Sequence, residues 1–203
     1  MDYFETTLST LEPTYLAATD PRAQSGFRGD AARWERARRV IVSAMHRDGD
    51  FLDIGCANGL LMESVAAWAA QDGRAIEPYG LDLSARLTDL ARQRCPQLRE
   101  RIFVGNALTW VPPRQFDFVR TELVYVPPED HVGFVNRLRT EWLLPGGRLI
   151  ICAYGSSRDG RPRAERIGDH LRDAGFAVAG EAEARDLNGV VFTRIAWLEA
   201  ART

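Results

Sequence analysis

The residues best suited to chemistry gather around a glycine-containing turn in the first half of the chain. Residues 51–61 read FLDIGCANGLL, in which Asp53, Gly55 and Gly59 form a D-x-G-x-x-x-G pattern. Glycines allow a backbone to approach a ligand closely, and a helix that begins directly after the turn offers free N–H groups. The pattern therefore predicts a strand, a tight turn and a helix that together form half of a nucleotide-binding site.

The spacing of this turn separates the possible ligands. A dinucleotide site needs G-x-G-x-x-G, but Ala57 and Leu60 stand at the later two glycine positions. An NAD(P)-dependent reductase is disfavoured further because the chain has no lysine for a Tyr-x-x-x-Lys pair. A tight turn between a strand and a helix in some other α/β protein remains an alternative at this point.

A second acidic position lies about 30 residues further on. Asp82 ends a predicted strand over residues 76–81, and its carboxylate can accept both hydrogens of a ribose diol. Ser84 or Asp82 can also cap the following helix, over residues 85–94. The two interpretations are compatible, because the strand end and the helix start are the same place.

Hydrophobic periodicity predicts how these residues are positioned. The further expected strands cover residues 51–54, 101–104, 116–119 and 149–153, and a hairpin of 176–184 and 190–198 turns at Asn188-Gly189. The further expected helices cover residues 31–46, 60–68, 127–142 and 163–174. Alternating strands and helices predict an α/β fold: a three-layer, seven-stranded, mostly parallel sheet with an antiparallel last strand and helices on both faces. We expect a single domain, 1–203, with an N-terminal helical cap over 1–46 and a core over 47–203.

Several motifs in order resemble those of class I S-adenosylmethionine (SAM)-dependent methyltransferases of the small-molecule type. After the D-x-G-x-x-x-G turn come GLDLS at 80–84, GNA at 105–107, FDFV at 116–119 and LPGGRL at 144–149. The resemblance covers about residues 34–199 and implies a Rossmann-like fold with SAM as cofactor. It departs at Asn106, where the family usually has aspartate; an amide oxygen can still accept from the adenine amino group.

The resemblance also assigns residues to the cofactor site. They are Asp53, Gly55, Cys56, Ala57, Asn58, Gly59, Leu60, Asp82, Leu83, Asn106, Ala107 and Thr121. The sulfonium of SAM makes its methyl group electrophilic, so the protein mainly has to align an acceptor with it. The sequence therefore specifies the cofactor site better than the catalytic residues.

The acceptor side has three candidate catalytic residues and four candidate binding residues. Glu122 and Tyr125 follow the fourth predicted strand, and His131 could act as a general base near the sheet edge. The alternatives are an exposed helix position for His131 and a backbone contact for Glu122. The candidate substrate-binding residues are Tyr15, Phe27 and Arg28 from the cap and Tyr154 after the fifth strand.

Composition limits the partners. The formal net charge of −2 and pI near 6.0 argue against a nucleic-acid partner. Three separated cysteines and three histidines form no metal-binding pattern, so no metal is expected. No leader or long apolar run is evident, which predicts a cytoplasmic protein without a membrane partner. Arginines 33, 36, 38 and 39 are interpreted as a solvated helix face.

The expected function is methyl transfer from SAM to oxygen or nitrogen of a small molecule, in secondary metabolism as a hypothesis. The expected partner is a small-molecule methyl acceptor, and the expected assembly is a monomer or a homodimer. A non-catalytic relative that binds the cofactor, or that serves as a scaffold, remains the alternative.

Overall fold

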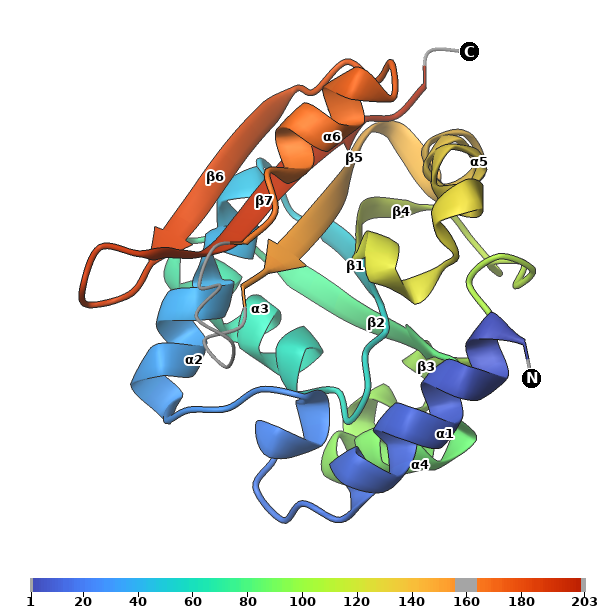
Figure 1. Cartoon of the computed structure of the whole chain (residues 1–203), viewed down its shortest axis with the longest axis vertical. Coiled ribbons are helices and arrows are strands. Elements are labelled where there is room, and N and C mark those ends of the chain that lie inside the picture. Colours follow the sequence, from blue (N-terminus) through green and yellow to red (C-terminus); the bar gives the residue numbers. More distant parts are fainter. Residues whose placement is uncertain (1, 156–163, 202–203) are drawn as a thin grey trace.

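A seven-stranded sheet forms the centre of the computed structural model, which describes residues 2–155 and 164–201. Its strands are β1 (Gly49–Ile54), β2 (Ile76–Asp82), β3 (Ile102–Val104), β4 (Phe116–Thr121), β5 (Leu143–Tyr154), β6 (Gly180–Arg185) and β7 (Val191–Glu199). The strand order is β3-β2-β1-β4-β5-β7-β6 (Figure 1). Strands β1 to β5 are parallel to one another, whereas β7 runs antiparallel to both β5 and β6. The predicted mostly parallel sheet with an antiparallel last strand is confirmed.

Helices cover both faces of this sheet (Figure 1). The α-helices are α1 (Tyr3–Leu16), α2 (Ala31–Arg38), α3 (Leu60–Gln71), α4 (Ala85–Arg94), α5 (His131–Arg137) and α6 (Ile167–Asp173). The short 3₁₀-helices are η1 (Ala23–Ser25), η2 (Arg39–Ala44), η3 (Pro96–Arg101), η4 (Leu123–Tyr125) and η5 (Pro128–Asp130), and η6 (Leu138–Trp142) is a short π-helix. Within the described ranges, no helix is both long and apolar enough to span a membrane.

Two apolar cores fix the layers. On one face, Phe134 of α5 and Leu171 of α6 pack with Trp142 against the sheet. On the other face, Trp34 of α2 and Trp68 of α3 pack against it together with η2. Successive side chains along each strand point to opposite faces of the sheet. Burial of apolar surface therefore stabilises the parallel strands from both sides.

The N-terminal helix α1 is an exception, because none of its side chains is buried. It begins with a capping box between Asp2 and Glu5. Polar contacts tie it to the core: the Tyr3 hydroxyl donates to the Val124 carbonyl, and Glu12 accepts from the Ser84 hydroxyl. Helix α1 is therefore attached to the core through these hydrogen bonds, whereas the rest of the cap, including Trp34 and Ile41, packs in an apolar core.

Several boundaries differ from the sequence expectations. The helix expected over 31–46 tightens at η2 and ends before His46, and the helix expected over 127–142 is divided into η5, α5 and η6. Strand β5 begins at Leu143, earlier than expected, because the proline–glycine turn lies inside the strand as an irregularity in its pairing with β4. Gly146 has a φ of +73° there, a conformation that glycine adopts readily. The expected start of the helix over 163–174 lies outside the described residues.

Candidate cofactor and acceptor site

One large cavity opens where the carboxyl ends of the parallel strands meet the cap. Its volume is about 1370 Å³, and its walls come from α1, the segment around Phe27, α2, and the residues that follow β1, β2, β3, β4 and β5. Ligands of open α/β sheets bind outside the carboxyl ends of the strands. This cavity is therefore the candidate functional site.

The turn after β1 forms the floor of the cavity. Gly55 has a φ of +77°, and its N–H donates to the Leu81 carbonyl at 2.7 Å. A Cβ at this position would collide with the ring of Tyr125, so only glycine fits between the turn and that ring. Ala57 also has a positive φ, of 46°, which is unusual for a residue with a side chain. The chain keeps this strained backbone directly beside the cavity.

Asp82 joins the end of β2 to this turn. Its Oδ2 accepts from the Ala57 N–H and its Oδ1 from the Ser84 N–H, each at 2.8 Å. Burial raises the pKa of Asp82, while these two backbone N–H groups oppose the rise. A carboxylate oxygen accepts more than one hydrogen bond, and Asp82 lines the cavity. The carboxylate thus fits a ribose diol while also holding the turn.

Asn106 lies in the loop after β3, on the same wall as Ala107 and Leu83. Its Oδ1 accepts from the Leu108 N–H at 2.9 Å, which fixes the side chain. The structure gives its amide N–H₂ no partner among the described residues. The side chain therefore retains donors, and a second acceptor site on its oxygen, for a flat heterocycle.

Six of the twelve sequence-assigned cofactor residues line the cavity: Gly55, Ala57, Asp82, Leu83, Asn106 and Ala107. The six that do not are Asp53, Cys56, Asn58, Gly59, Leu60 and Thr121. Asn58 is fully buried and donates to the Pro21 carbonyl, so its side chain ties the cap to the turn. Cys56 packs against Gly80. Asn58 and Cys56 therefore support the turn on the side away from the cavity.

Arg120, which no sequence motif marks, lies buried behind the cavity wall, with only 2% of its surface exposed. Asp53 and Arg120 are register partners on β1 and β4, and Arg120 Nη1 is 3.1 Å from Asp53 Oδ1. Its Nη2 contacts Glu122 and donates to the Tyr154 hydroxyl at 2.9 Å. The guanidinium therefore connects Asp53 of β1, Glu122 after β4 and Tyr154 at the end of β5.

The burial of Asp53 has a measurable electrostatic consequence. Burial raises the pKa of Asp53 from 3.8 to about 6, and the adjacent Arg120 lowers it only in part. A carboxyl group whose pKa is raised on folding stabilises the fold below the unfolded pKa, and that contribution is lost as pH rises through the folded pKa. The difference from 3.8 to about 6 corresponds to about 3 kcal/mol.

We therefore expect Asp53→Asn to change the pH dependence of stability. The free energy of unfolding of the unmodified chain, minus that of the variant, should fall by up to about 3 kcal/mol as pH rises from about 4 to about 7. Denaturant titrations of both proteins in the same series of buffers measure this difference. A difference that stays constant over that range would contradict the expectation.

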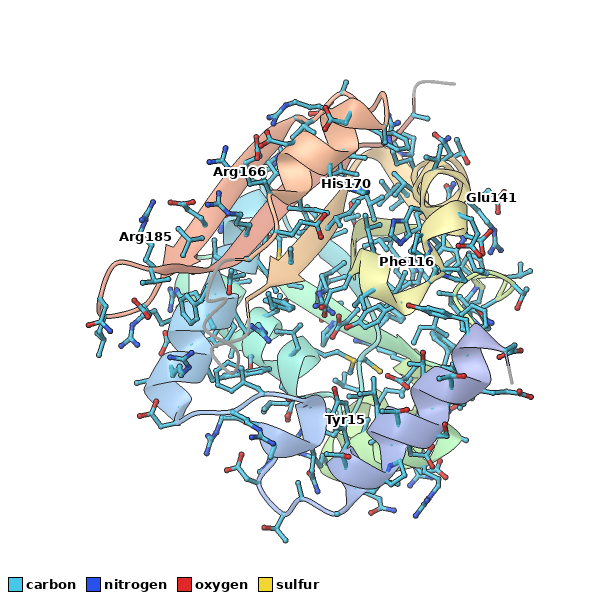
Figure 2. All side chains as sticks on the ribbon, in the orientation of Figure 1. Tyr15, Phe116, Glu141, Arg166, His170 and Arg185 are labelled. Carbon is cyan, nitrogen blue, oxygen red and sulfur yellow. The ribbon has the colours of Figure 1, made fainter. Side chains whose placement is uncertain are left out.

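Glu122 and Tyr125 both line the cavity, as expected for residues after the fourth strand. The Tyr125 hydroxyl donates to Glu122 Oε1 at 2.6 Å, and burial raises the pKa of Tyr125. His131 is not among the cavity-lining residues: its ring lies 5.9 Å from that of His170, which Figure 2 shows far from Tyr15. The structure thus brings two of the three catalytic candidates together.

The four substrate-binding candidates, Tyr15, Phe27, Arg28 and Tyr154, all line the cavity. Tyr15 projects from α1 (Figure 2). Burial raises the pKa of Tyr15 most, and the negative charges of Glu122 and Asp82 raise it further. Burial also raises the pKa of Tyr154. Both tyrosines therefore remain neutral hydrogen-bonding groups at physiological pH.

Strand order, the antiparallel β7 and a glycine turn after β1 together define the Rossmann-like fold of class I methyltransferases. Residues 51–147 match the family model described as "Methyltransferase domain". Residues 51–147 therefore carry a SAM-dependent methyltransferase domain, and the fold around them is that of class I methyltransferases. No curated protein sequence matches the chain at a significant level.

Two solved structures illustrate the likeness in fold. The N-methyltransferase NodS from Bradyrhizobium japonicum, in complex with S-adenosylhomocysteine (SAH), has 17% sequence identity and a TM-score of 0.67, covering 97% of this chain and 99% of its own. The 1,6-didemethyltoxoflavin-N1-methyltransferase of Burkholderia thailandensis, with that compound and SAH bound, has 17% identity and a TM-score of 0.63, covering 100% of this chain and 92% of its own. At this identity the likeness shows the fold alone.

Proposed function

We propose that this methyltransferase transfers the methyl group of SAM to an oxygen or nitrogen atom of a small molecule. The observation that carries the proposal is that a single cavity joins Gly55, Asp82 and Asn106 to Glu122 and Tyr125. Its volume of about 1370 Å³ exceeds the range of roughly 300–1,000 Å³ typical of a site for one small ligand. The cavity therefore has room for the cofactor and for an acceptor beside it.

The proposed cofactor contacts follow the order of the strands. The backbone at Gly55 and Ala57 faces the amino-acid portion, because this turn lies at the centre of the strand edge. Asp82 accepts hydrogen bonds from the ribose hydroxyls. Asn106 and Ala107, beyond β2, hold the adenine. Each of these residues lines the cavity.

Bound SAM supplies a methyl group that is already electrophilic because it is attached to a positively charged sulfur. The acceptor atom forms a bond to the methyl carbon while the carbon–sulfur bond breaks and its electron pair remains on sulfur. Alignment of the acceptor can supply roughly 7–11 kcal/mol of barrier lowering. We propose that Glu122 takes the proton that a hydroxyl or ammonium acceptor must lose. Arg120 and Tyr125 hold its Oε1 in place.

Ligand-induced changes in thermal stability test the cofactor part of the proposal. At about a hundredfold excess over the dissociation constant, SAM or SAH should add about 2.7 kcal/mol of stability. For a domain of this length this corresponds to a rise of roughly 5–10 °C in melting temperature, whereas NADH should cause none. Acceptor mixtures with SAM, followed by mass spectrometry for SAH and methylated product, then test transfer. Cofactor binding without any product would favour the non-catalytic alternative.

Asp82→Asn is expected to weaken SAH binding by roughly 10- to 100-fold, because a charged acceptor of two hydroxyl hydrogens becomes a neutral amide. Calorimetric titration with SAH measures the effect. Asp89→Asn is the matched control on α4, since Asp89 is exposed and pairs only with Arg92 among the described residues. Equal affinities of the Asp82 variant and the unmodified chain would remove Asp82 from the cofactor site.

A further inference from the structure

Beyond the proposed cofactor contacts, the cavity has a second group of walls. We name it the arginine–aromatic arm and define it by Phe27, Arg28, Arg33, Arg38, Tyr154 and Phe192. These residues come from the cap, the end of β5, and β7, whereas the proposed cofactor contacts follow β1, β2 and β3. In the sheet, β5 and β7 lie on the opposite side of β1 from β2 and β3. The arm therefore occupies the acceptor half of the cavity.

Two arginines of the arm are held against aromatic rings. The Arg38 guanidinium carbon lies 3.4 Å from the centroid of the Tyr154 ring and 5.2 Å from that of Phe27. The Arg33 guanidinium carbon lies 5.2 Å from the centroid of the Phe192 ring. Such stacking uses the flat face of a guanidinium and leaves the N–H donors at its edge available. The rings thus position the arginines without satisfying their hydrogen bonds.

The arm also carries positive charge that no acidic side chain of the described residues neutralises in an ion pair. Among the described residues, none of Arg28, Arg33 and Arg38 has an acidic partner. The adjacent Arg39, by contrast, pairs with Glu35 and Asp72 outside the arm. Unpaired cations along a cavity wall attract an anionic group, and a guanidinium fork matches the two oxygens of a carboxylate.

The arm is compact enough for one ligand to reach both arginines. Phe27 contacts Arg38, and a Cβ on Gly29 would meet both the Arg33 stem and the Phe27 ring. Phe27 therefore lies near both of these arginine side chains. Its ring, with those of Tyr154 and Phe192, offers apolar surface to a flat molecule.

We propose that the methyl acceptor is a planar aromatic acid. Its ring packs among Phe27, Tyr154 and Phe192, and its carboxylate accepts hydrogen bonds from Arg33 and Arg38. The inference rests on the proposed function, because it specifies the substrate class of the same site. It also assigns a binding role to two arginines that the sequence pattern indicated as part of a solvated helix face.

Matched pairs of acids and amides test this inference. The probes are 4-hydroxybenzoate, anthranilate, indole-3-carboxylate and quinoline-2-carboxylate, each beside its own carboxamide, with phenyl phosphate as a further anion. They are titrated calorimetrically into the chain saturated with SAH. We expect at least one acid to bind roughly tenfold to a hundredfold more tightly than its carboxamide. Tighter binding of phenyl phosphate than of every acid would overturn the assignment of a carboxylate.

Variants then assign the preference to the arm. Arg33→Gln combined with Arg38→Gln should reduce the acid-over-amide ratio to within about threefold, since both forks are removed. Arg33→Gln alone should reduce it in part and avoids the ring packing around Arg38. Arg36→Gln is the matched control on α2, because Arg36 faces a separate cavity. It should leave the ratio unchanged.

The outcomes separate this inference from the proposed function. No preference for any acid, or a preference that survives in the double variant, overturns the inference while SAH binding stands. Loss of SAH affinity in the double variant without any acid preference assigns the arginines to the carboxylate of the cofactor and also overturns it. Failure of the unmodified, folded chain to bind SAH would instead refute the proposed function itself.

Discussion

Glu122→Gln is expected to lower kcat by roughly 100- to 10,000-fold for an acceptor that must lose a proton. Glutamine has nearly the same size, and its oxygen can still accept from Arg120 and Tyr125 in place of Glu122 Oε1. It cannot take up a proton at neutral pH. The loss should therefore appear in kcat, with the dissociation constant of SAH changed little. Initial rates of SAH formation at saturating SAM, together with calorimetric titration of SAH, measure the two quantities.

Glu129→Gln provides the control for this substitution. Glu129 is exposed in η5, a few residues further along the same segment, and does not line the cavity. Its removal should leave kcat within about twofold, as expected for a surface change. If the Glu122 variant also kept kcat within that range, Glu122 would have no role in proton transfer, and alignment alone would explain catalysis.

Arg120→Met is expected to lower the free energy of unfolding by about 3–5 kcal/mol, because it leaves Asp53 buried without its cationic partner. Asp53 is fully buried, and one of its oxygens already lacks a hydrogen-bond partner within the described structure. Methionine fills a similar volume, so the loss of charge pairing rather than an empty cavity determines the effect. Denaturant unfolding followed by circular dichroism measures it.

Two further variants make this prediction specific. Arg39→Met removes an arginine whose ion pairs are at the surface, and it should leave the free energy of unfolding nearly unchanged. Combining Asp53→Asn with Arg120→Met removes both charges of the buried pair. The double variant should be more stable than Arg120→Met alone, because the fully buried Asp53 carboxylate is no longer left uncompensated and only the partly exposed Glu122 loses its cation. Equal losses in the Arg120 and Arg39 variants would show that the buried pair has no special importance.

The sequence predicted the fold well because its signals are local. Apolar runs that end in Gly55 and Asp82 mark the ends of β1 and β2, and each lies beside the residues that define its turn. The expected helix cap after β2 is Ser84, whose side chain accepts from the Leu87 N–H. Asp82 accepts from the Ala57 N–H and lines the cavity, and its contact with a ribose stays a prediction. Boundaries failed where tertiary pairing decides them, as at Leu143, where pairing with Phe116 extends β5.

The site was predicted less completely because parts of it depend on strand order. Arg120 is separated from Asp53 by 67 residues, and only the pairing of β4 with β1 makes them neighbours. Nothing in the spacing of the sequence indicates this pair. That Arg33 and Arg38 line the cavity was missed for the same reason, since two of the rings they contact, Phe192 and Tyr154, lie on β7 and β5. His131 lies by His170 rather than at the cavity because α5 and α6 share one face of the sheet.

The surface attachment of α1 has a thermodynamic consequence for any ligand beneath it. The helix contributes residues to the cavity wall but buries no side chain completely, so its local unfolding costs less free energy than that of the core helices. A ligand in contact with Tyr15 adds to the helix the contacts that it otherwise lacks. Linkage requires these effects to be equal: the factor by which a docked α1 raises ligand affinity is the factor by which the ligand favours docking. The affinity of this site for its ligand therefore depends in part on how fully α1 is docked.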